Sequence, residues 1–185
     1  GKVTAFGASV LQSNTTGINN TAVGGATDAA GASLQNNTTG GYNTAVGNVS
    51  LRSNTTASFN SAVGYSALAL NTTGAYNTGV GMDALFSNTT ASNNTAVGYK
   101  ALYSGTTATR NTALGIEAGE LNTTGSYNVF LGAYAGEQTS TGQKNVFIGD
   151  GSGYLVTSGS QNTILGRYSG NQGGLDIRTS SNQIV

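Results

Sequence analysis

The chain has 185 residues, with seven Lys or Arg and seven Asp or Glu, so its formal net charge is zero. This balance gives no electrostatic case for nucleic acid or for an anionic membrane surface as a partner. No apolar run approaches the roughly 20 residues of a transmembrane helix, so we expect no membrane insertion. Cysteine and histidine are both absent, which excludes thiolate, disulfide and imidazole chemistry.

A short phrase recurs along the chain at a fixed spacing. Residues 60–64 (NSAVG) return as residues 77–81 (NTGVG) and 94–98 (NTAVG), with the glycine 17 residues later each time. Self-similarity at a fixed period predicts one elongated array of repeats. The ten anchor glycines are Gly7, Gly24, Gly47, Gly64, Gly81, Gly98, Gly115, Gly132, Gly149 and Gly166.

The predicted domain organisation follows from these anchors. Residues 1–170 form a ten-coil array, and residues 171–185 form a C-terminal cap or junction. The step from Gly24 to Gly47 is 23 residues, which is one period plus a six-residue insertion within residues 25–35. This insert, which contains Asp28, is the best candidate for a local projection.

Each position of the repeat keeps its character, and together the positions predict an all-β fold. The residue before each glycine is apolar. From the first anchor glycine to Gly149, only Gly or Ala stands ten places after the anchor, with Gly40 in register after the insertion. Gly, Asn and Thr form helices poorly, and 17 residues are too few for a pair of helices. We therefore predict a parallel β-solenoid, or β-roll, of 17-residue coils stacked about 4.8 Å apart. Each coil is expected to contain two short strands, with the apolar residue before the glycine in the core.

Two positions change size together along the chain. Four places after the glycine, leucine gives way to glycine, and two places before it, alanine gives way to phenylalanine or isoleucine. A core of constant packing density requires such compensation, so we infer that both positions share one interior layer. The first position holds Leu11, Leu51, Leu68, Leu85 and Leu102, then Gly119, Gly136, Gly153 and Gly170; the second holds Ala62, Ala96 and Ala113, then Phe130, Phe147 and Ile164.

Polar side chains also recur in register. Aligned amides one coil apart can form an asparagine ladder. Asp83, Lys100 and Glu117 alternate in sign at one position of successive coils and are expected to form a small ion ladder. The ladder asparagines are Asn20, Asn43, Asn60, Asn77, Asn94, Asn111, Asn128, Asn145 and Asn162.

An aromatic stripe is predicted where Tyr42, Phe59 and Tyr76 fall in consecutive coils. Such a stripe is either a packing surface for a partner chain or a ligand platform. The apolar core of one coil is thin, so burial against other copies favours chain packing. We therefore expect self-association, as a homotrimeric fibre.

Several phrases resemble known fibre repeats. Residues 43–47, 71–77 and 94–102 resemble repeats of bacteriophage tail fibres, and they are similar to the head repeats of trimeric autotransporter adhesins, whose coil is shorter. Residues 174–185 resemble the segment that precedes an endosialidase-type intramolecular chaperone domain in tail fibres. The resemblance implies a structural fibre segment, located in the virion tail fibre, that serves attachment to a host-surface receptor. A bacterial cell-surface or secreted trimeric adhesin is the alternative.

No catalytic, cofactor-binding or metal-binding residues are predicted, and we expect that the protein is not an enzyme and uses no cofactor. Glycosidases need two carboxyl groups across a cleft, but Glu120 and Glu137 hold one position of adjacent coils, as on a solvated face. No Asp-x-Asp-x-Asp calcium loop is present. The acids considered are Glu117, Glu120, Glu137, Asp150 and Asp176.

The recurring Asn-Thr-Thr triplets match the acceptor pattern for N-glycosylation, but the repeat itself accounts for their recurrence. Their first threonines would form a regular hydroxyl array, as on ice-binding solenoids, which is a third functional class. The turn-like setting argues against the flat face that ice binding requires. The triplets start at Asn14, Asn37, Asn54, Asn71, Asn88 and Asn122, and the array comprises Thr15, Thr38, Thr55, Thr72, Thr89, Thr106 and Thr123.

Overall fold

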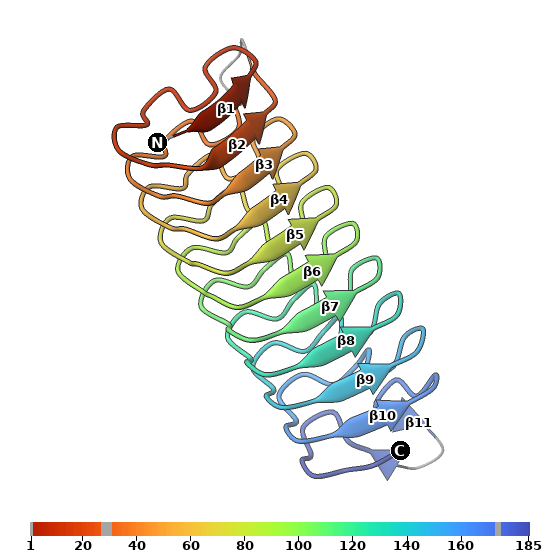
Figure 1. The fold of residues 1–185 in the computed structure, drawn as a ribbon. Coiled ribbons are helices and arrows are strands. Elements are labelled where there is room, and N and C mark those ends of the chain that lie inside the picture. The colour runs from red at the N-terminus through yellow and green to blue at the C-terminus, as the bar shows by residue number, and fades with distance from the viewer. Residues whose placement is uncertain (1, 27–30, 173–174) are drawn as a thin grey trace.

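The fold is a parallel β-solenoid, as predicted. The computed structural model describes residues 2–26, 31–172 and 175–185. Ten strands follow one another in sequence order across a single sheet, each parallel to the next, and the described residues contain no helix. The coils form a rod with the two ends of the chain at opposite ends (Figure 1).

The strands are short and evenly spaced. In the ten-stranded sheet they are β1 (Val3–Phe6), β2 (Asn20–Val23), β3 (Thr44–Val46), β4 (Ser61–Val63), β5 (Thr78–Val80), β6 (Thr95–Val97), β7 (Thr112–Leu114), β8 (Val129–Leu131), β9 (Val146–Ile148) and β10 (Thr163–Leu165). Equivalent residues pair directly, for example Val63 with Val80, so the sheet has no register shift between these coils. A second sheet pairs β11 (Asn171–Gln172) with β12 (Leu175–Asp176).

Each coil of the array contains one strand, so the prediction of two was wrong. The opposite side of the coil also bonds to the next coil: the Leu68 amide donates to the Ala84 carbonyl oxygen at 2.9 Å. Its backbone, however, visits the left-handed region at alternate residues, with φ of 56° at Ser66 and 53° at Leu68. This alternation curls the segment into turns, because a strand needs extended dihedral angles throughout.

The core lies between the strand and these turns. Ala62 and Leu68 are both fully buried, and each stands in a column of equivalent residues along the rod. The residue before the anchor glycine, predicted in the core, points outward instead: Val63 is 39% exposed. Strand side chains alternate between faces, so burial of Ala62 requires exposure of Val63.

The predicted compensation between leucine and phenylalanine is confirmed. Phe130 and Phe147 are fully buried at the strand position that alanine holds in earlier coils. A Cβ atom on Gly119 would lie 2.5 Å from Cδ2 of Phe130, and one on Gly153 would lie 2.5 Å from Cδ2 of Phe147. The aromatic rings therefore fill the space that leucine occupies in the N-terminal half.

The predicted asparagine ladder is also confirmed. At each step the backbone amide of one asparagine donates to the side-chain oxygen of the previous one, as between Asn77 and Asn60 at 2.9 Å. The ladder runs from Asn20 to Asn162 with every rung bonded. Because these amides are buried, an unpaired rung would leave a polar group without water, so the ladder fixes the register of the coils.

The asparagines of the Asn-Thr-Thr triplets form a second buried ladder. Nδ2 of Asn71 donates to Oδ1 of Asn54 at 3.0 Å, and it also donates to the Gly74 carbonyl oxygen at 2.9 Å. That carbonyl oxygen accepts from Asn60 of the first ladder too, at 2.9 Å. The carbonyl group of the small residue ten places after the anchor glycine thus joins the two ladders. This close packing is the physical reason why only Gly or Ala stands there.

The second ladder has a gap at Gly105, where the repeat calls for asparagine. Oδ1 of Asn88 is buried there without a hydrogen-bond partner. The Ala108 carbonyl oxygen accepts from Asn94 but has no second amide. Gly105 therefore leaves buried hydrogen-bonding capacity unused, which is destabilising.

Replacing Gly105 with Asn should stabilise the fold by about 1–2 kcal/mol, because the new amide can bond Asn88 and the Ala108 carbonyl group. A Cβ at this site would lie 3.2 Å from the Asn122 carbonyl oxygen, so a small shift suffices. Urea unfolding followed by circular dichroism would measure the change. Gly105→Ala is the control: an equal gain for alanine would mean that backbone entropy, rather than the ladder, explains the effect.

The end of the insert and the C-terminal segment both pack against the coils of the solenoid. Within residues 25–35, the proposed projection and Asp28 fall on residues 27–30, outside the described residues, whereas Leu34 is fully buried in the core. At the other end, the Gln183 amide donates to Oδ1 of Asn162 at 2.9 Å, and Ile184 forms a parallel bridge with Thr163. The last residues thus lie on the final coil, and Gln183 takes the place that the next asparagine of the ladder would hold.

Candidate functional surfaces

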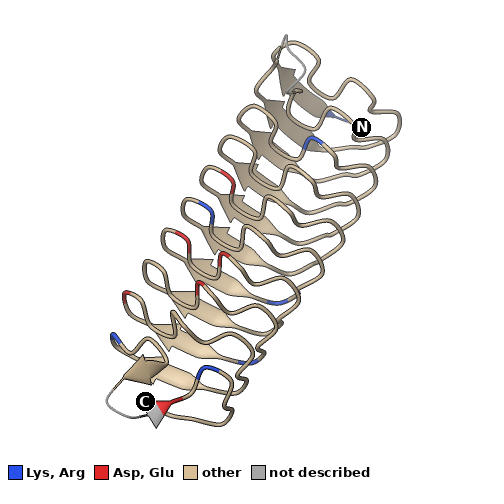
Figure 2. Ribbon diagram, turned by 180° about the vertical axis from the view of Figure 1, so that it is seen from behind, with Lys and Arg blue, Asp and Glu red and all other residues tan. Residues whose placement is uncertain are grey.

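The outer face of the ten-stranded sheet carries two columns of side chains. The first column is mostly threonine. The second column is aliphatic, and its residues follow those of the first by two positions in the sequence. From β2 to β10 the columns contain no charged residue: Thr21, Thr44, Ser61, Thr78, Thr95, Thr112, Val129, Val146 and Thr163; and Val23, Val46, Val63, Val80, Val97, Leu114, Leu131, Ile148 and Leu165. Charged residues lie mostly on the loops (Figure 2). We call this surface the sheet face.

The predicted aromatic stripe is confirmed as a stack of exposed rings. The ring centroids of Tyr42 and Phe59 are 5.0 Å apart with 9° between the planes, and those of Phe59 and Tyr76 are 5.0 Å apart with 3° between them. Both faces of the Phe59 ring are therefore covered by its neighbours. A ligand could stack only on the outer faces of the two tyrosines.

Lys100 attracts both Asp83 and Glu117, but the predicted ion ladder forms no direct ion pair between these three residues, because Lys100 pairs with a residue of another column. Its Nζ lies 3.2 Å from Oε1 of Glu120, and it lies over the rings of Tyr99 and Tyr103. The hydrogen bond to Glu120 raises the pKa of Lys100. Asp83, expected to share the ladder, is partly covered instead, and this desolvation raises its pKa against the opposing attraction of Lys100.

The carboxylates of the C-terminal half are distributed along the rod. The Glu120 side chain, expected on a solvated face, is only 15% exposed because it packs against Lys100. Desolvation raises the pKa of Glu137, while a hydrogen bond from Tyr154 acts in the opposite direction. Asp176 is paired with Arg178, which lowers the pKa of the aspartate. Among the described residues, no three acidic groups come together as metal ligands.

The Asn-Thr-Thr triplets form one edge of the rod and offer little free chemistry at their first two positions. Asn54 and Asn71 are fully buried, so their amides are inaccessible to a glycosylating enzyme. The first threonine hydroxyl groups bond within the stack, as where Oγ1 of Thr72 donates to the Thr89 carbonyl oxygen at 3.0 Å. These hydroxyl groups of the predicted array therefore already donate to backbone carbonyl oxygens of the next coil. The second threonines, such as Thr73, are exposed.

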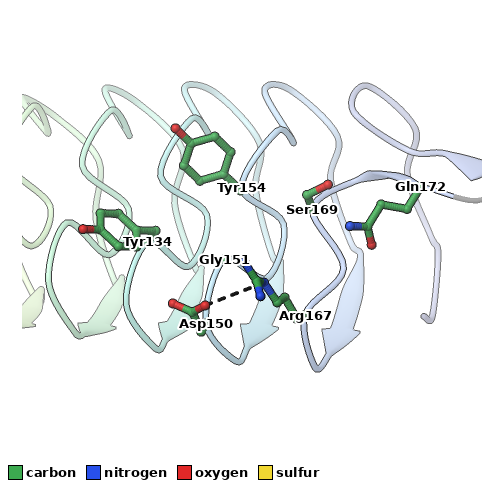
Figure 3. A pocket seen from close by; sticks show the side chains of 7 residues that line it. All are labelled: Tyr134, Asp150, Gly151, Tyr154, Arg167, Ser169 and Gln172. Carbon is green, nitrogen blue, oxygen red and sulfur yellow. Dashed lines mark ion pairs between the residues drawn. The ribbon is translucent and has the colours of Figure 1, made fainter.

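One groove interrupts this regular surface near the C-terminal end. Its volume is about 360 Å³, and residues from three neighbouring coils line it (Figure 3). The side chains of Asp150 and Arg167 approach each other across it, with 3.8 Å between Oδ2 and Nε. The lining residues are Tyr134, Asp150, Gly151, Tyr154, Arg167, Ser169 and Gln172. The sequence singled out Asp150 only as an acid, and it did not predict the groove.

The fold and these surfaces define a parallel β-solenoid with regular columns of side chains. No family model matches the chain, and neither a curated protein nor a solved structure shows a significant match. In the part of the chain that the structure describes, there is no helix with the length and hydropathy to cross a membrane.

Proposed function

We propose that the chain is a structural segment of a homotrimeric bacteriophage tail fibre that serves host attachment. The sheet face is the observation that carries this proposal. It is an uncharged, partly aliphatic surface that follows the whole rod, and large exposed apolar surfaces of this kind mark sites of protein association. The resemblance of residues 43–47, 71–77 and 94–102 to tail-fibre repeats adds the virion context.

The dimensions of the sheet face suit the packing of copies. Ten strands about 4.8 Å apart give a surface about 45–50 Å long. The aromatic stack borders the threonine column, because Tyr42 precedes Thr44 by two residues. Together these columns are broad enough to approach the roughly 800 Å² that each partner buries in a stable interface. Three rods with this face toward a common axis would shield it from water.

The mass in solution tests the oligomer. The unmodified chain should sediment with three times the chain mass. Val63→Lys combined with Leu114→Lys should shift it to monomers, because two charges per chain would enter an apolar interface. Thr73→Lys combined with Thr107→Lys adds the same charge on the exposed triplet edge and should leave the trimer intact. A stable monomer of the unmodified chain would contradict the proposal.

A bacterial cell-surface or secreted adhesin of the same architecture remains the alternative to the phage fibre. Both roles use a stiff rod that associates with itself, so the rod does not separate them. The neighbouring genes would: tail-assembly genes support the phage fibre, whereas genes for export and anchoring would support the adhesin.

Ice binding is a second candidate, favoured by one observation on the sheet face. The hydroxyl groups of Thr44, Thr78 and Thr95 make no hydrogen bond within the described residues, and they repeat at the coil spacing on an uncharged sheet. A measurable thermal hysteresis from a monomeric chain would favour this function over the fibre. Absence of hysteresis would remove it.

A further inference from the structure

The groove occurs where the repeat itself changes. The position two places after the anchor glycine carries a side chain in the earlier coils, with Asp83, Lys100, Glu117 and Tyr134 all in the left-handed region at φ of 52–58°. Gly151 holds this position at φ 62°, and a Cβ there would have no atom within 4 Å. The missing side chain opens a gap in an otherwise filled column.

The next coil widens the gap. Here Tyr168, which would follow Gly151 in the column, packs against the hydrophobic core instead. Arg167 and Ser169, its neighbours in sequence, line the groove, and Gln172 of β11 closes its far side (Figure 3). The groove is therefore a local departure from the repeat.

The lining combines aromatic rings with paired polar groups. Tyr134 and Tyr154 supply ring surface on one side of the groove, and the hydrogen bond from Tyr154 to Glu137 orients the second ring. Asp150 accepts hydrogen bonds, Arg167 donates them, and Gln172 does both. A pyranose ring presents apolar C–H faces and a rim of hydroxyl groups, which need this combination of rings, acceptors and donors.

We propose that this groove binds a neutral saccharide, about one or two sugar rings in size. Its volume lies at the lower end of the range of small-molecule sites. This proposal deepens the proposed function, on which it rests, by assigning the chemical class of a surface receptor. In the complex, Tyr134 packs against a sugar face while Asp150 and Arg167 share the hydroxyl groups along its edge.

The charges of the groove select a neutral ligand over an acidic one. The carboxylate of Asp150 lies beside the guanidinium group of Arg167 and offsets its charge. An acidic sugar would have to displace Asp150 to reach the cation, and Asp150 would repel it. Neutral sugars keep the pair and bond to both members.

Glycan-array binding with the full chain tests the proposal. The probes are neutral hexose and N-acetylhexosamine oligosaccharides, with sialylated and uronic-acid oligosaccharides for comparison. We expect binding of neutral probes by the unmodified chain. Tyr134→Ala should weaken this binding about tenfold, as expected for the loss of one stacked ring. Tyr127→Ala, which removes an exposed ring outside the groove, should leave it unchanged.

A second variant blocks the groove without disturbing the coil. Gly151→Tyr places at this site the residue that Tyr134 provides one coil earlier with similar φ, so it should fold and abolish binding. Asp83→Tyr makes the same addition in the same column away from the groove and should bind normally.

Two outcomes would overturn the saccharide site: binding that Gly151→Tyr retains, or no binding of any neutral probe. Exclusive binding of acidic probes would also contradict it. The mass measurement reports on the fibre independently. A trimer that binds no glycan would contradict the saccharide proposal but not the fibre. A monomer would contradict the fibre.

Discussion

Gly64→Ala should destabilise the solenoid by about 3–5 kcal/mol, an effect large enough to unfold a marginally stable chain. Gly64 has φ of +133°, a conformation that is essentially restricted to glycine. A Cβ would also lie 2.6 Å from the carbonyl oxygen and 2.7 Å from the carbonyl carbon of Gly81 in the next coil. These are backbone atoms of a stacked coil, so they cannot move aside without breaking the register. Urea unfolding would measure the loss.

Gly151→Ala is the matched control for this prediction. Gly151 also has a positive φ, but open space surrounds the position of its missing Cβ. Alanine there should cost only about 1 kcal/mol for the left-handed conformation. If the two substitutions cost the same, the close approach of coils would not explain why the anchor glycines recur.

The columns of the solenoid could be predicted because a fixed period places equivalent residues above one another. The asparagine ladder and the exchange of Leu102 and Ala113 for Gly119 and Phe130 were readable for that reason. Both features depend only on which residues share a column, and the fixed period of the sequence assigns each residue to its column. The structure then shows that the exchange occurs between side chains in contact.

Whether the side chains of a column point into the core or toward solvent could not be predicted in the same way. The strand residues Ala62 and Val63 are both apolar, so alternation does not reveal which of them is buried. The answer depends on the opposite side of the coil, where Leu68 fills the interior and leaves room only for alanine. That arrangement requires leucine in the left-handed region, which leucine rarely adopts, so the sequence instead suggested a second strand.

The groove was missed because an absent side chain creates it. Gly151 resembles the other glycines of a glycine-rich chain until its column is compared with Glu117 and Tyr134. That comparison was the available signal. Tyr168, by contrast, packs against the core and departs from the repeat. A prediction based on the repeat period cannot anticipate such a departure.

Phe130→Ala should destabilise the fold by about 3–5 kcal/mol, because it removes a fully buried ring and leaves a cavity. Gly119→Leu alone should also destabilise it, because its Cβ would collide with the Phe130 ring. The double variant recreates the pattern of Leu102 and Ala113 and moves the boundary between the two core types by one coil. We therefore expect it to recover most of the stability that each single variant loses.

The size and the specificity of this recovery distinguish direct packing from a general effect. Contact between the two positions predicts a coupling energy near the upper end of the 0.5–3 kcal/mol found for touching residues. Gly119→Leu combined with Phe147→Ala provides the mismatched control, because the Phe147 ring fills the space beside Gly153, two coils beyond Gly119. Recovery in the mismatched pair, or strict additivity in the matched pair, would contradict a shared interior layer. Urea unfolding of the four single variants, Gly153→Leu included, and of three double variants would decide. The third double variant joins Phe147→Ala to Gly153→Leu, its partner in contact.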